Sequence, residues 1–225
     1  MLIDLKSNIK TINYAKVAAV GNDIEKASVS EIIFSKEALV GFAKNLIWIY
    51  EDIDKSKRFY VCTDPLGGVP SGNQIIGFYL ATGSPILKFS INSLKNCYEM
   101  RNSIIENKLT CCRYIEISPP EEDDVIEEYE LGHRNIAKIL LYNKNNIDIT
   151  ENIYEVSFEI NYEGLKNLAV ILLKLADNYQ EGAEYIFNST NGSGIILTAD
   201  SLQLKIKCGD LGNVYDYEPK YGLGH

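Results

Sequence analysis

The sequence predicts an α+β protein built from two tandem copies of one β-β-α-β-β-β unit. Two observations support this prediction. The stretch SKEALVGFAKNLIWIY at residues 35–50 has the same pattern as NYEGLKNLAVILLKLA at 161–176, and GFYLATGSPILKFS from Gly77 aligns without a gap to GIILTADSLQLKIK from Gly194. Runs typical of strands flank both pairs in the same order. We therefore expect that each unit, residues 1–104 and 105–225, is an antiparallel sheet with one helix packed on a face.

Both long stretches have the spacing of an amphipathic helix. Apolar residues recur at i, i+3, i+4 and i+7 from Leu39 and again from Leu165, which places them on one buried face. Ser35 and Asn161 precede the two helices, and we expect each side chain to accept a hydrogen bond from an N–H of the first turn. Glu37 and Glu163 then lie where negative charge favours the helix dipole. The start of each helix is therefore specified by its sequence.

The other regular segments are expected to be strands separated by turns rich in Gly, Asn, Ser and Pro. In the second unit, Tyr185–Ser189 follows the helix as Phe59–Thr63 does in the first. Residues alike in both units, such as Ser84 and Ser201 or Lys88 and Lys205, are interpreted as determinants of the fold. The expected strands of the first unit cover residues 2–20, 29–34, 58–63, 74–81 and 86–91.

Acidic residues are concentrated in the second unit. The net charge is −9; residues 1–104 contain 12 Lys and Arg against 10 Asp and Glu, whereas residues 105–225 contain 10 against 21. This balance disfavours nucleic acid or an anionic membrane as a partner. It is compatible with a basic protein partner that is attracted at long range.

The sequence also predicts a cytoplasmic protein. The N-terminus MLIDLKSNIK has charges where a signal peptide would have an apolar run, and no apolar run approaches the ~20 residues that span a bilayer. The five cysteines lack the spacing of a disulfide framework, which suits free thiols in a reducing compartment.

No motif for catalysis, a cofactor or a metal stands out. His133 is the one internal histidine, and Cys111 and Cys112 are the thiols that would have to pair with it. Adjacent thiols on a strand point to opposite faces, so one of them is expected to be a small buried hydrophobe. Glycine-containing loops lack the order of phosphate-binding motifs. We therefore expect a protein that is not an enzyme, with no cofactor and no metal.

Two acidic segments that contain tyrosine are the candidate partner-binding regions. Carboxylates would attract a basic surface, and tyrosine offers a large contact area with a polar tip. The first segment has the alternative of being a solvated connector. The candidate residues are Glu121, Glu122, Asp123, Asp124, Glu127, Glu128 and Tyr129 in the first segment, and Asp210, Tyr215, Asp216, Tyr217 and Glu218 in the second.

The second unit resembles a known family. EVSFEINYEGLKNLAVILLKLADNY followed by EYIFNSTNGSGIILTADSLQLKIK looks like the strand-helix-strand-hairpin unit of small immunity proteins that protect bacteria from polymorphic or contact-dependent toxins. The likeness covers residues 155–207 and, more faintly, 30–89. It implies a non-catalytic cytoplasmic inhibitor of a cognate toxin domain, commonly a nuclease. These families share no binding motif, so the resemblance assigns no residue a role.

These observations favour a protein-binding module, an immunity protein that neutralises a basic toxin. One alternative is a small-molecule-binding protein with its site between the two units, which polar groups from both units lining a deep pocket would support. The other alternative is a structural or assembly subunit.

Overall fold

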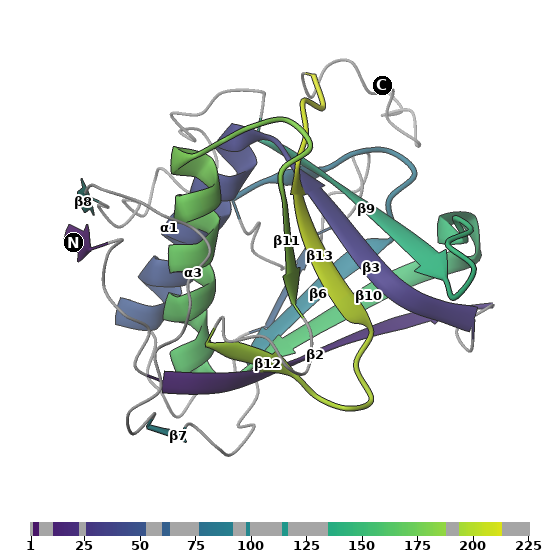
Figure 1. Ribbon diagram of the computed structural model, residues 1–225, viewed down its shortest axis with the longest axis horizontal. Coiled ribbons are helices and arrows are strands. Elements are labelled where there is room, and N and C mark those ends of the chain that lie inside the picture. The colour runs from purple at the N-terminus through teal and green to yellow at the C-terminus, as the bar shows by residue number, and fades with distance from the viewer. Residues whose placement is uncertain are drawn as a thin grey trace, which may run out of the picture.

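The computed structural model describes residues 2–4, 11–22, 26–52, 60–63, 77–91, 98–99, 114–116, 135–187 and 194–212. It confirms the α+β class (Figure 1), with the helices α1 (Lys36–Asp52) and α3 (Tyr162–Asp177) packed beside two sheets. The strands are β1 (Leu2–Asp4), β2 (Thr11–Gly21), β3 (Ala27–Phe34), β4 (Tyr60–Thr63), β5 (Tyr79–Leu80), β6 (Ile86–Ile91), β7 (Tyr98–Glu99), β8 (Tyr114–Glu116), β9 (Ile136–Asn143), β10 (Ile153–Ile160), β11 (Glu184–Phe187), β12 (Ile195–Leu197) and β13 (Gln203–Cys208), and a 3₁₀ turn, η3 (Thr150–Asn152), precedes β10.

The two main sheets each contain strands from both halves of the chain. The first sheet has the order β12-β2-β10-β6-β4, with β7 also pairing with β2, and the second has the order β11-β13-β3-β9-β5. Parallel and antiparallel neighbours alternate within both. This differs from the expected single antiparallel sheet per unit. The reason is that side-chain alternation shows which face of a strand is buried and does not show which strand lies next to it.

The pairing registers of the two sheets are equivalent to each other. Val17 of β2 lies opposite Phe158 of β10, and Ile139 of β9 lies opposite Ile32 of β3. These pairs correspond under the offsets that relate the two halves of the sequence, 122 residues for β2 and β9 and 126 for β3 and β10. The parallel pairs β6–β10 and β13–β3 correspond in the same way. The described strands are therefore related by an approximate twofold axis that exchanges the units. The predicted boundary at residues 104 and 105 lies outside the described residues.

One predicted equivalence needs a correction of two residues. In the first sheet Val61 lies opposite Phe89, and in the second sheet Tyr185 lies opposite Ile206. Because Phe89 and Ile206 are equivalent, Tyr185 corresponds to Val61 and not to Phe59. A length difference between the helix and this strand therefore shifts the alignment, and loops tolerate such changes.

The core lies between the two sheets and the helix pair. The helices pack against each other, α1 also contacts β3 and β9, and α3 also contacts β2 and β12. In Figure 1 the strands β11, β13, β3 and β9 cross in front of β6, β10 and β2, and both helices lie along one side. Their apolar residues form one buried cluster. Gly77 has a φ of 85°, and a Cβ on Gly41 would lie 2.2 Å from the Gly77 carbonyl oxygen. Glycine at both positions lets α1 approach the chain that leads into β5.

The two expected helix caps have different outcomes. Ser35 caps α1 as predicted, because its Oγ accepts a hydrogen bond of 3.1 Å from the Ala38 N–H. The Asn161 side chain makes no capping hydrogen bond to α3. Its Nδ2 instead donates to Asn13 Oδ1 of β2 at 2.7 Å. The prediction for Asn161 was wrong because the bond from Nδ2 to the buried Asn13 fixes the orientation of the amide, and its Oδ1 then makes no hydrogen bond to the described residues.

Ser84 and Ser201 have the structural role that their equivalence indicated. Ser84 Oγ accepts a hydrogen bond of 3.1 Å from the Ile139 N–H of β9, and Ser201 Oγ accepts one of 2.8 Å from the Val17 N–H of β2. The short strands β5 and β12 leave some backbone N–H groups of β9 and β2 without a strand partner. Each hydroxyl therefore satisfies one of these donors.

The equivalent residues Asn13 and Asn135 give a matched test of this packing. Both are fully buried, but among the described residues Asn135 has no hydrogen-bond partner for its side-chain amide, whereas Asn13 binds Asn161. Asn13→Leu should lower the free energy of unfolding by about 1–3 kcal/mol because it leaves the Asn161 amide without that acceptor. Asn135→Leu should cost less or stabilise. Urea denaturation of both variants measures the difference, and equal losses would contradict it.

Candidate functional site

One of the predicted partner-binding residues, Asp210, lies in the described part of the chain. It follows β13 and is exposed. Its Oδ1 accepts a hydrogen bond of 3.0 Å from the Gly212 N–H, and the preceding Gly209 N–H donates to the Phe34 carbonyl at 3.0 Å. These bonds fix the position of Asp210 beside the end of β3. The residues outside the described part are Glu121, Glu122, Asp123, Asp124, Glu127, Glu128, Tyr129, Tyr215, Asp216, Tyr217 and Glu218, as are Cys111, Cys112 and His133.

The loop that follows α3 lies against the end of β13. Gly182 N–H donates to the Cys208 carbonyl at 2.8 Å, and Cys208 N–H donates to the Ala183 carbonyl at 2.8 Å. Gly182 has a φ of 82°, a conformation that glycine adopts without strain. Tyr179, at the start of this loop, packs against the core cluster. The hydrogen bonds thus hold Tyr179 close to Cys208 and Asp210.

Carboxylates from three separate elements lie close enough to Tyr179 to influence its phenol. Burial raises the pKa of its phenol to about 12, and the negative charges of Cys208, Asp210, Glu37 and Glu181 add to that shift. Glu37 belongs to the first turn of α1, Glu181 to the loop after α3, and Asp210 to the segment after β13. We call Glu37, Tyr179, Glu181 and Asp210 the acidic site.

The chemistry of the acidic site suits recognition of a cation. The Tyr179 phenol stays protonated at neutral pH, and burial also raises the pKa of the nearby Cys208 thiol. That thiol is fully buried, so it is a poor nucleophile. Glu181 and Asp210 are exposed, and Glu37 and Tyr179 are partly buried. Carboxylates beside a partly exposed aromatic ring favour a lysine or arginine side chain. In the part of the chain that the structure describes, no cluster of His, Cys, Asp and Glu could hold a metal ion.

The opposite end of the helix pair has a different arrangement. The rings of Tyr50 and Tyr162 stack at a centroid distance of 4.9 Å, and the Tyr50 hydroxyl donates to Glu163 Oε2 at 3.0 Å. The Tyr162 hydroxyl donates to the Tyr50 carbonyl, and Lys166 Nζ lies 5.8 Å from the Tyr50 ring centroid. These contacts tie α1 to α3, so we assign this end a structural role.

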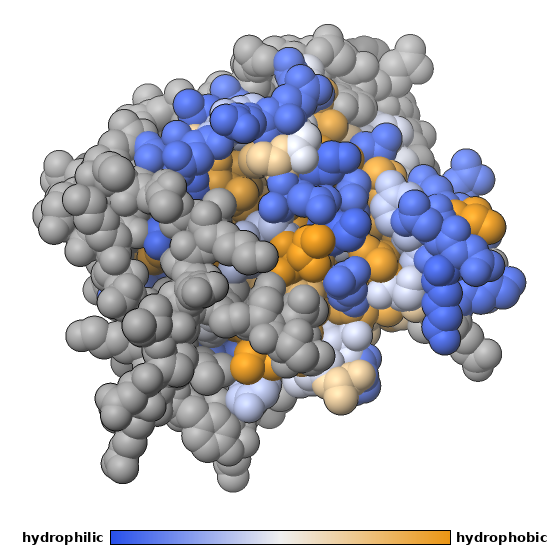
Figure 2. All heavy atoms as spheres, viewed as in Figure 1, coloured by the Kyte–Doolittle hydropathy of each residue, from blue (hydrophilic) through white to orange (hydrophobic). Residues whose placement is uncertain are grey.

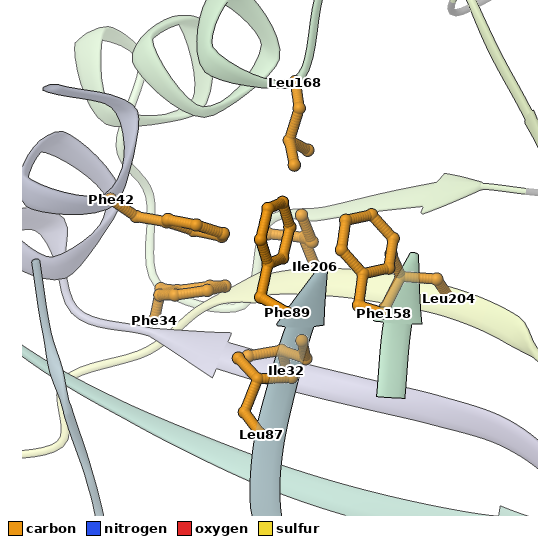
Figure 3. Close-up of a pocket in the computed structure, with 9 residues that line it drawn as sticks. All are labelled: Ile32, Phe34, Phe42, Leu87, Phe89, Phe158, Leu168, Leu204 and Ile206. Carbon is orange, nitrogen blue, oxygen red and sulfur yellow. The ribbon is translucent and has the colours of Figure 1, made fainter. Parts of the chain in front are cut away.

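A small cavity lies among side chains of both sheets and both helices (Figure 3). The space open to the centre of a water molecule is about 10 Å³, and the side chains around it come from both units and from both helices. A volume of this size holds about one water molecule. The apolar lining gives no support to a small-molecule site between the units, which would need polar groups from both. The lining residues are Ile32, Phe34, Phe42, Leu87, Phe89, Phe158, Leu168, Leu204 and Ile206.

The surface over the second sheet mixes hydrophobic and hydrophilic residues. Figure 2 shows hydrophobic residues there in small groups separated by hydrophilic ones. Two large apolar side chains are exposed near the β9–β10 connection, Ile147 at 57% and Tyr154 at 59%. Scattered exposed side chains of this kind are ordinary on a soluble protein, so we do not include them in the candidate site.

Sequence reasoning missed most of the acidic site. Glu37 was considered only for its effect on the dipole of α1, and Tyr179 and Glu181 were not considered as binding residues. A tyrosine next to an acid in a loop is a weak signal, and Glu37 lies far from both in the sequence. Only the folded chain brings the three side chains together with Asp210.

Comparisons with known proteins give no relative for this chain. No protein-family model, no curated protein and no solved structure matches it. Among the helices in the described residues, none has both the length and the apolar content that crossing a membrane requires.

The raised pKa of Tyr179 predicts a specific loss of stability in alkali. Between pH 10 and about 12 the unfolded chain releases the phenolic proton while the folded chain retains it, so rising pH favours unfolding over that interval. Below pH 10 the phenol is protonated in both the folded and the unfolded chain, so no stability is lost there. Tyr179→Phe removes the phenolic group and with it this pH dependence. The free energy of unfolding of the wild-type protein, relative to that of the variant, should therefore fall as pH rises from 9 to 11. Urea denaturation at each pH measures the two free energies. A constant difference would contradict the assignment.

Proposed function

We propose that this protein is a non-catalytic binding module that neutralises a basic protein partner, as bacterial immunity proteins do with toxin domains. The observation that carries the proposal is the hydrogen bonding of the loop after α3 to the end of β13, which brings Tyr179 and Glu181 near Asp210. Carboxylates of three separate elements are close enough there to add to the raised pKa of the Tyr179 phenol. A lysine or arginine on the partner would meet negative charge and an aromatic ring at one place. The cytoplasm is the proposed site of action.

Charge supports the proposal at longer range. The excess of Asp and Glu in the second half attracts a basic partner before contact and raises the rate of association. Tyr179 adds contact area that is held in place by its packing against the core, so little side-chain entropy is lost on binding.

The first experiment identifies the partner. The tagged protein is used to capture proteins from a lysate of its own source, and the captured proteins are identified by mass spectrometry. The proposal expects one stoichiometric basic protein whose toxic activity the purified chain inhibits. A captured partner whose activity is unchanged by the chain would contradict neutralisation. Self-association alone would favour an assembly subunit.

A pair of charge-matched variants tests the acidic site against that partner. Glu181→Gln with Asp210→Asn should lower the association rate about three- to tenfold at low salt and make its salt dependence shallower. The control is Glu151→Gln with Glu159→Gln, which changes the net charge equally but lies on η3 and β10. Stopped-flow or surface-based kinetics measure both. Equal effects of the two variants would show that only total charge matters and would remove the site from the proposal.

A further inference from the structure

The units of this chain complete each other's sheets. In the first sheet β2 of the first unit pairs with β10 and β12 of the second, and β6 pairs with β10. In the second sheet β3 of the first unit pairs with β9 and β13 of the second, and β5 pairs with β9. Within these two sheets, the described pairings inside one unit are β4–β6, β11–β13 and the short β2–β7.

One unit alone would therefore leave long strands without their partners. Strands β2 and β3 follow each other in the chain but do not pair with each other among the described pairings. A separate first unit would expose the backbone donors and acceptors of both, together with their buried faces. Partly exposed ion pairs also join the units, with Lys16 Nζ 2.5 Å from Asp200 Oδ2 and Lys88 Nζ 3.5 Å from Glu155 Oε1. The surface that each unit presents is thus fitted to the other unit.

The core shows that the two units are complementary and not interchangeable. At some equivalent positions both side chains are described and buried, and only one of the two has an aromatic ring. At most of these positions the first unit supplies phenylalanine and the second an aliphatic residue. The pairs are Phe34 and Ile160, Phe42 and Leu168, Phe78 and Ile195, and Phe89 and Ile206, with Ile32 and Phe158 in the opposite sense.

These rings interdigitate around the axis. The ring centroids of Phe42 lie 5.2 Å from Phe78 and 5.6 Å from Phe89, and Phe89 lies 5.1 Å from Phe158. In Figure 3, Leu168 of α3 points toward the cavity from the side opposite the sheet strands, near Phe42 and Phe89. Two first units together would place extra rings in this space, and two second units would leave it underfilled. Both overpacking and cavities destabilise a core.

We propose that each unit is a specific binding surface for the other, so that the protein is a covalently joined heterodimer whose first unit accepts a second unit and rejects another first unit. Backbone pairing between the units supplies the affinity. It does not supply specificity, because both units use equivalent registers. The phenylalanine and aliphatic pairs supply the specificity, because only the mixed combination fills the core.

The full chain with one protease recognition sequence inserted between residues 104 and 105 tests the proposal. The folded protein is cut, and size-exclusion chromatography with light scattering should show both fragments in one 1:1 complex with the mass of the uncut chain. After unfolding in urea and refolding, the mixed complex should exceed either homodimer by about tenfold or more, a difference that needs a modest specificity free energy. Separation of the fragments, or refolding into homodimers, would overturn the proposal.

The denaturation midpoint gives an independent readout. For the cut protein the urea midpoint should rise with protein concentration, because folding is then bimolecular, whereas that of the uncut protein should not. A midpoint of the cut protein that does not depend on concentration would mean that each unit folds alone, and would also overturn the proposal.

Exchanging one ring across the axis tests the source of specificity. Phe42→Leu and Leu168→Phe, introduced separately into the cut chain, should each lower the ratio of mixed complex to homodimer several-fold. The double variant restores one phenylalanine and one leucine around the cavity of the mixed complex and should recover part of that ratio, because the two homodimers remain over- and underfilled by one ring. If the ratio of the double variant fell by the product of the two single decreases, these side chains would not specify the pairing.

Discussion

The antiparallel pairing of β2 with β10 and of β3 with β9 is the constraint on which the rest of the structure depends. These pairs place Val17 opposite Phe158 and Ile139 opposite Ile32, so that the buried faces of strands from both halves point into one core. Strands β6 and β13 then add in parallel on the outer sides of β10 and β3. With the sheets fixed in this way, α1 and α3 close the remaining side by packing on each other and on both sheets.

The same pairing bends both sheets at equivalent places. A register shift occurs between Ile153 and Glu155 in β10, and an equivalent shift occurs between Ala27 and Val29 in β3. Each shift is a bulge with one extra residue, Tyr154 or Ser28, and bulges increase local twist. The Ser28 hydroxyl donates to the Tyr142 carbonyl at 3.2 Å, whereas Tyr154 is 59% exposed. The two units thus have a bulge at the same position of the backbone, although the bulged side chains differ.

The sequence predicts well which segments form helices and strands, and predicts poorly which strands lie next to each other in the sheets. Helical spacing locates α1 and α3 within two residues, and β6 is predicted at its observed bounds, because those patterns depend on which side of a segment is buried. The exchange of strands between the units depends on contacts between residues far apart in the sequence, to which periodicity is insensitive. Asn161 shows the same limit on a smaller scale, since its helix-capping pattern is correct but its side chain binds Asn13 on another strand. The acidic site is the hardest case, because Glu37 and Tyr179 meet only after α1 and α3 have packed.

The approximate twofold symmetry separates residues required by the fold from residues free to serve function. Exchanging the units maps Glu37 onto Glu163, at opposite ends of the antiparallel helix pair. At one end Glu163 accepts the hydroxyl of Tyr50, and Lys166 lies over the same ring. At the other end burial raises the pKa of the Tyr179 phenol, and the nearby charges of Glu37, Glu181 and Asp210 add to that shift. Among the described residues, Glu163 is thus part of the contact between the helices, whereas Glu37 lies near other carboxylates. The binding role proposed above for the acidic site would account for this difference, because neighbouring carboxylates attract a partner of opposite charge.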